Sequence, residues 1–208
     1  MAIGTSASLL LLQPATITEL ILGTGAAMIG SVISDIDIGT SDSHREADKI
    51  VAFAAFTVIL IFLAESIWDI GIYQKLLSNS SIMQATPSVA AFFVICAIGK
   101  EQPHRSFMHS FLALGLLTGC VAGFLPLLAP YFGIAFLSHL IADLFNRKGE
   151  RLFFPMKKGF RLNLCSSKGL VNRILFRVCS LITVGSIIFH IFRIFGILQF
   201  LPFIGWSF

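Results

Sequence analysis

Long uncharged stretches are the feature that most constrains the fold of this chain. Of its 208 residues, 56% are hydrophobic and only 12% are charged, whereas a soluble domain carries about 25% charged residues. The mean hydropathy is +0.87. Crossing the hydrocarbon core of a bilayer takes about 20 apolar residues of α-helix. We therefore expect an all-α, polytopic membrane protein, a bundle of about five to six transmembrane helices.

Six apolar segments can be marked along the sequence. They cover residues 8–34, 50–72, 85–99, 107–128, 131–145 and 174–203. The first contains Pro14, and the last is long enough to tilt or to break near Gly196. The third and fifth are shorter than a full span. Because the apolar residues are gathered in long runs along the whole chain, we expect one integral membrane domain over residues 1–208.

The N-terminus and the cysteines fit this class. The N-terminus has neither a basic region nor a clear cleavage site, so we expect no removable signal peptide. The cysteines show no paired spacing, and we expect free thiols that pack as small hydrophobic side chains. They are Cys96, Cys120, Cys165 and Cys179.

Basic residues predict the orientation in a cell membrane (inner or plasma membrane). The segment 146–173 holds eight Lys or Arg and one Glu, and basic loops stay on the cytoplasmic side. Alternation then places loops 35–49 and 100–106 in the cytoplasm, while the outer loops carry one basic residue, Lys75. The loop 146–173 also suits anionic membrane lipids, although it can equally serve as a topology signal alone.

This topology brings three polar motifs to the same membrane depth. They are "SDID" at 34–37, "HRSFMHS" at 104–110 and "SHLIAD" at 138–143. His139 and Asp143 are four residues apart and share a helix face. They suit one metal ion, two adjacent ions or a structural hydrogen bond inside the bundle. Ionisable residues within a membrane bundle indicate a functional site.

The other two motifs have comparable alternatives. Asp35 and Asp37 end an apolar run, where the partial negative charge of a helix C-terminus favours a bound cation, unless the two carboxylates are simply solvated. His104 and His109 converge best if Ser106 caps the following helix and places His109 one turn inside it.

Taken together, the motifs offer three carboxylates and three imidazoles. Nitrogen and oxygen ligands without thiolates suit zinc, manganese or iron. Four to six ligands suggest two ions, a pair that activates water and binds the oxygens of a phosphate or ester. The chain has no HExxH, GxSxG or Walker motif. A transporter or ion pathway stays an alternative, although such a pathway needs polar residues across the whole bilayer.

The three motifs resemble those of the YdjM-like family of membrane-bound, predicted metal-dependent hydrolases, some of which are LexA-regulated. That family reads "PDIDHPxS", "HRGFTHS" and "SHLxxDxxTPxGVPLLWP". This chain reads "SDIDIGTS", "HRSFMHS" and "SHLIADLFNRKGERLFFP", the last aligning without a gap from Ser138 to Pro155. It departs at Ile38, where the family has histidine, and it has no histidine before His44.

The resemblance implies a site and a chemistry. The implied metal ligands, for one or two divalent ions such as Zn²⁺ or Mn²⁺, are Asp35, Asp37, His104, His109, His139 and Asp143. The implied catalytic residues are Asp37 or Asp143 as proton acceptor and Arg105 for developing charge. Arg105, Asn146 and Ser41 would contact the substrate.

The HxxxD element is also remotely similar to one in zinc-dependent phospholipase C, which points to a phosphate ester or a lipid. We therefore expect a membrane-bound, metal-dependent hydrolase at the cytoplasmic interface, acting through metal-activated water. Its partners would be membrane lipids and a small-molecule or lipid substrate, with no nucleic acid. A non-catalytic scaffold with a vestigial site is the remaining alternative.

Overall fold

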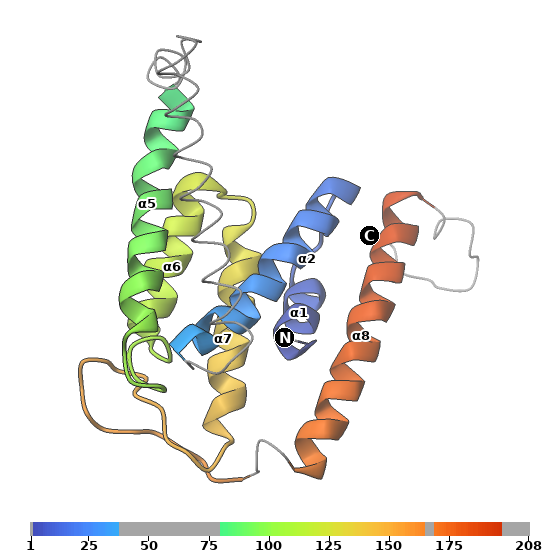
Figure 1. Ribbon diagram of the computed structural model, residues 1–208. Helices are drawn as coiled ribbons and strands as arrows, with labels where there is room; N and C mark the ends of the chain where they lie inside the picture. The colour runs from blue at the N-terminus through green and yellow to red at the C-terminus, as the bar shows by residue number, and fades with distance from the viewer. Residues whose placement is uncertain (1, 38–79, 165–168, 197–208) are drawn as a thin grey trace, which may run out of the picture. The chain divides into compact units, whose positions relative to one another are not determined.

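The computed structural model describes residues 2–37, 80–164 and 169–196 (Figure 1). Their elements are α1 (Ala2–Leu11), α2 (Ile17–Val32), the 3-10 helix η1 (Ile33–Asp37), α5 (Ser80–Lys100), α6 (Phe111–Phe124), α7 (Ala129–Leu144) and α8 (Leu170–Ile194). Within these ranges the only β-pairing is an isolated bridge between Glu150 and Phe160. The prediction of an all-α protein is confirmed for this part of the chain.

Two helical stretches, Ile17–Asp37 and Arg173–Ile194, are long and apolar enough to cross a membrane. The other described helices are apolar but offer shorter stretches of 10–17 residues. The count of five to six spans therefore stays a prediction. The second predicted segment, 50–72, and Ser41 lie outside the described residues.

The first predicted segment, residues 8–34, is wrong as a single helix, because α1 and α2 are separate. Pro14 stands between them and has no N–H to continue a helix. Thr16 and Glu19 then cap α2. The Glu19 N–H donates to Thr16 Oγ1 at 3.1 Å, and the Ala15 N–H donates to the Glu19 carboxylate at 2.8 Å. This reciprocal cap gives the carboxylate a structural role at the start of α2.

The fourth predicted segment begins later than expected. Ser110, not Ser106, is the N-cap of α6, and its side chain accepts from the Ala113 N–H at 3.2 Å. The Ser106 hydroxyl donates to the Pro103 carbonyl instead. His109 therefore lies in the loop before the helix and not one turn inside it.

The end of α8 agrees with the sequence. Gly196 has a φ of 69°, a left-handed conformation that glycine adopts without strain, and its N–H donates to the Arg193 carbonyl at 3.1 Å. α8 thus ends just before Gly196, and residues 197–203 of the predicted sixth segment lie outside the described residues. Three of the cysteines, Cys96, Cys120 and Cys179, are free as expected, and Cys165 lies outside the described residues.

The chain forms two compact units. The first unit comprises Met1–Ser31, Pro130–Lys148 and Arg161–Phe208, and the second comprises Val32–Ala129 and Gly149–Phe160. That residues 1–208 form a single membrane domain stays a prediction.

Small residues let α2 and α7 pack closely in the first unit. A Cβ added at Gly30 would meet the backbone of Phe132, and one at Gly23 would lie 2.8 Å from the Tyr131 ring. Ala27 is fully buried against Tyr131. The spacing of Gly23, Ala27 and Gly30 places small residues on one face, as in helix contacts within membranes.

The same unit joins α1 to α8. His190 Nε2 lies 2.9 Å from the Leu9 carbonyl oxygen. Arg193 donates to the Gln13 side chain at 2.8 Å and to the Pro14 carbonyl at 2.7 Å. These bonds satisfy carbonyl groups that the break between α1 and α2 leaves without helical partners.

The second unit is built on α5 and α6, which run side by side (Figure 1). Gly123 of α6 lies against Ser88 of α5. Phe92 and Phe124 meet edge to face, with ring centroids 6.1 Å apart. Contacts of α5 with η1 place the aspartates of η1 in this unit.

Candidate metal centre

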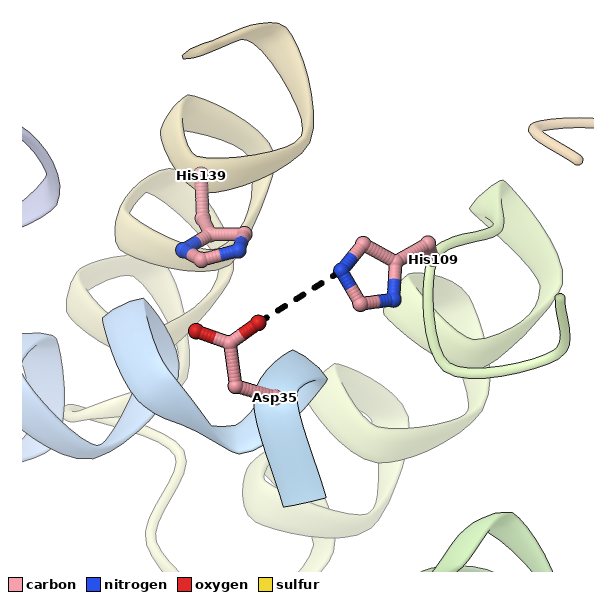
Figure 2. A group of neighbouring side chains, drawn as sticks. All are labelled: Asp35, His109 and His139. Atoms are coloured by element: carbon pink, nitrogen blue, oxygen red, sulfur yellow. Dashed lines mark ion pairs between the residues drawn. The ribbon is translucent and has the colours of Figure 1, made fainter. Parts of the chain in front are cut away.

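The two aspartates of η1 bracket one buried imidazole. The Asp35 Oδ1 atom lies 3.6 Å from His109 Nε2, the ion pair drawn in Figure 2. The Asp37 Oδ2 atom lies 3.6 Å from His109 Nδ1. Successive residues of a 3-10 helix turn by about 120°, so side chains two residues apart leave in different directions. The two carboxylates accordingly reach different nitrogens of the same ring.

Asp37 is the centre of this group. Its Oδ1 atom lies 2.9 Å from His104 Nδ1, and its Oδ2 atom accepts from the Arg105 N–H at 3.1 Å. The His104 and His109 rings meet edge to face, with centroids 5.0 Å apart. The side chains of Asp37 and His109 are fully buried, whereas that of His104 is 35% exposed. One edge of the group is therefore open to solvent.

The backbone of Arg105 is strained and is held by hydrogen bonds on both sides. Its φ of 65° lies in the left-handed region, which costs a non-glycine residue on the order of 1 kcal/mol. The Arg105 carbonyl accepts from the Arg151 N–H at 3.1 Å, while its own N–H binds Asp37. Both backbone groups are thus fixed, and the role of the guanidinium group in substrate binding stays a prediction.

The sequence did not single out Glu150, which belongs to the same surroundings. Glu150 is 0% exposed, and one of its carboxylate oxygens lies within 4.8 Å of a His109 ring nitrogen. It stands where the family motif quoted above has valine. The one available signal was that Glu150 is the single acidic residue in the basic loop 146–173.

Burial removes water from the His109 ring, which lowers its pKa. The adjacent carboxylates of Asp35 and Asp37 and the charge of Glu150 outweigh burial, and together they raise the pKa of His109 to about 9. The carboxylates of Asp35, Asp37 and Glu150 thus favour a positive charge at the His109 ring. A divalent cation would also supply positive charge there.

The donor set fits a divalent metal ion. Asp37, His104 and His109 each offer one ligand atom, and these atoms lie within 4.8 Å of one another. The Asp37 Oδ1 atom lies 2.9 Å from His104 Nδ1, and the Asp37 Oδ2 atom lies 3.6 Å from His109 Nδ1. Two ligands bound at about 2.1 Å to one tetrahedral ion lie roughly 3.4 Å apart. Small side-chain movements would therefore place the three atoms around one ion.

The third predicted motif lies in the first unit. His139 Nε2 is 3.9 Å from Asp143 Oδ2, four residues along α7, and Figure 2 labels His139 on this helix. The Asn146 side chain donates to Asp143 Oδ1 at 2.9 Å. Asn146 thus orients one of the predicted ligands directly.

The structure therefore brings together four of the predicted site residues in the second unit, Asp35, Asp37, His104 and His109. It places His139, Asp143 and Asn146 in the first unit, and their membership of the same centre stays a prediction. Ser41 lies outside the described residues.

Comparison with known proteins gives one match. A family model described as YdjM inner membrane protein matches residues 1–205. No curated protein matches the chain. No solved structure matches it either.

Proposed function

The chain belongs to the YdjM inner membrane protein family, and from this premise we propose that it is a membrane-bound, metal-dependent hydrolase. Its site would face the cytoplasm, and its substrate would be a phosphate ester or a lipid. The observation that carries the proposal is the group of Asp37, His104 and His109, whose ligand atoms lie within 4.8 Å of one another.

Four residues of the second unit would hold the metal: Asp35, Asp37, His104 and His109. His139 and Asp143 would complete the ligand set from α7. Zinc and manganese both accept mixed imidazole and carboxylate ligands. When bound, a divalent ion would supply an activated water and neutralise negative charge on the substrate.

The remaining roles follow from position and chemistry. Arg105 follows His104 directly and can bind a phosphate with its planar guanidinium group. Asp143 is a candidate proton acceptor, because the Asn146 amide already orients its carboxylate. Asp37 is the alternative acceptor, although its bonds to His104 and to the Arg105 N–H favour a ligand role. Asn146 and Ser41 are proposed substrate contacts.

The loop 146–173 supports a substrate at the membrane surface. Lys157 and Lys158 are exposed, as are Phe153 and Met156. Exposed cationic and apolar side chains together suit the headgroup region of an anionic leaflet. A phospholipid would present its phosphate at this level.

The first test is metal content. We expect the full-length protein, purified in detergent, to carry one or two divalent ions per chain by mass spectrometry. Asp37→Asn should lose most of this metal, whereas Glu101→Gln, a change at an exposed acidic residue of the second unit, should not. A monodisperse wild-type protein that neither carries nor takes up an ion would refute the metal centre.

The second test is activity. The metal-loaded protein is incubated with anionic phospholipid vesicles and, separately, with a water-soluble phosphodiester, and products are followed by ³¹P NMR. Hydrolysis that disappears in Arg105→Ala and Asp143→Asn supports the proposal. Metal flux into proteoliposomes without hydrolysis would instead favour the transporter alternative.

A further inference from the structure

Glu150 is a buried carboxylate that the proposed roles do not use. It is 0% exposed, and its carboxylate lies within 4.8 Å of a His109 ring nitrogen. Burying a carboxylate is costly unless opposite charge compensates for it. The chain places this side chain beside an imidazole that already contacts Asp35 and Asp37.

Backbone hydrogen bonds fix Glu150 from both sides. It exchanges two bonds with Phe160, at 2.9 Å and 2.8 Å. The next residue, Arg151, donates to the Arg105 carbonyl at 3.1 Å, and Leu152 accepts from the Phe111 N–H at 2.9 Å. The segment 150–152 is thus bonded to the loop that carries the two histidines.

The direction of the Glu150 side chain follows from its burial and from the neighbouring imidazole. Glu150 and Leu152 are buried, while Arg151 between them is partly exposed. Glu150 is therefore held on the inner side of the segment, where His109 lies.

We propose that Glu150 is a metal ligand on the His109 side of the centre and that it shifts the site toward ions that prefer oxygen, such as Mn²⁺. This inference rests on the metal centre of the proposed function. Carboxylate ligands favour manganese, and imidazole ligands suit zinc. With Glu150, the second unit would offer three carboxylates and two imidazoles as metal ligands.

The test measures the affinity for Mn²⁺ and Zn²⁺ separately. Full-length protein in detergent is stripped with a chelator and titrated with each ion by calorimetry. Glu150→Gln keeps the side-chain shape and removes the charge. We expect it to weaken Mn²⁺ binding at least about tenfold and Zn²⁺ binding by less. Glu101→Gln, the matched exposed control, should change neither affinity.

Two further variants guard against a folding defect in Glu150→Gln, and size-exclusion chromatography checks each one. Glu150→Asp keeps the carboxylate and should retain the Mn²⁺ preference, at reduced affinity. Glu150→His replaces oxygen with nitrogen and should raise the Zn²⁺ affinity relative to that for Mn²⁺. A folded Glu150→Gln or Glu150→His protein with the wild-type ratio of affinities would overturn the inference.

The outcomes separate this inference from the proposed function. Wild-type protein that binds both ions with unchanged affinities in the Glu150 variants overturns the ligand role alone. Wild-type protein that binds neither ion overturns the metal centre and the ligand role with it. Binding that depends on Glu150, without hydrolysis of any substrate, supports the ligand role and overturns the hydrolase.

Discussion

The two aspartates of the candidate metal centre differ in their burial and in their contacts. Asp37 is fully buried and binds His104, the Arg105 N–H and His109, whereas Asp35 is 30% exposed at its side chain. Asp37 therefore has a structural role besides its proposed role as a ligand.

Asp37→Asn should lower stability more than Asp35→Asn. Removing the charge leaves two imidazoles and a backbone N–H with a poorer acceptor, and breaking a buried charged interaction costs about 3 kcal/mol. Chemical denaturation in detergent, with metal removed by a chelator, would measure the difference. Equal stability of the two variants would show that Asp37 does not organise the group.

Two substitutions at Arg105 distinguish the effect of backbone strain on stability from the role of the guanidinium group in activity. Arg105→Gly should stabilise the fold relative to Arg105→Ala, because glycine adopts a φ of 65° without strain. The expected difference is about 1 kcal/mol. Both variants lack the guanidinium group, so both should lose hydrolysis of a phosphate substrate. Activity that differs between two equally folded variants would contradict a substrate-binding role for the side chain.

At the scale of elements, close helix contacts depend on particular glycines. Gly30 of α2 has no room for a Cβ because the backbone of Phe132 occupies that space, whereas Gly25 on the same helix faces open space. A pair of identical substitutions can therefore distinguish packing from helix propensity.

Gly30→Ala should destabilise the first unit by about 1 to 3 kcal/mol, because α2 and α7 must separate to admit the methyl group. Gly25→Ala should be neutral or stabilising, since alanine favours helix by about 1 kcal/mol. Thermal unfolding followed by circular dichroism measures both. A neutral Gly30→Ala would mean that the contact is looser than the structure indicates.

Element boundaries also show what sequence patterns can and cannot predict. The apolar runs that begin at residues 85, 107, 131 and 174 fall on α5, α6, α7 and α8, and Gly196 follows the end of α8. The run 8–34 contains Pro14, but its length suggested one span, whereas the structure has two helices there. Ser106 and Ser110 are equally good caps by residue type, and both hydroxyls donate to the carbonyl three residues earlier. The cap of α6 is Ser110, whose side chain also accepts from the Ala113 N–H.

At the scale of the whole molecule, each unit gathers its own predicted ligands. Asp35, Asp37 and the two histidines His104 and His109 come together within the second unit, and His139 lies 3.9 Å from Asp143 within the first. The polar motifs were visible because charges are rare in so apolar a chain. Glu150 was hidden among basic residues, since its burial depends on pairing with Phe160 and not on any local pattern. Long-range pairing of this kind leaves no periodic signal in the sequence.

The predicted orientation can be tested on intact cells. A cysteine introduced at Lys158, in the basic loop, should be protected from a membrane-impermeant maleimide until the membrane is opened. One introduced at Lys75 should react from outside, because the basic-residue rule places that loop opposite. The native cysteines are first replaced by serine. The reverse pattern of labelling would place the metal centre outside the cell.

The bonds between α1 and α8 have a consequence for how the protein is made. Leu9 and His190 are 181 residues apart, so at 5–20 residues per second the ribosome delivers the partner of α1 roughly 10 to 40 s late. Throughout that interval the carbonyls near Pro14 lack the arginine that later binds them. The insertion machinery, or water at the bilayer surface, must therefore supply hydrogen-bond donors to these carbonyls until α8 emerges.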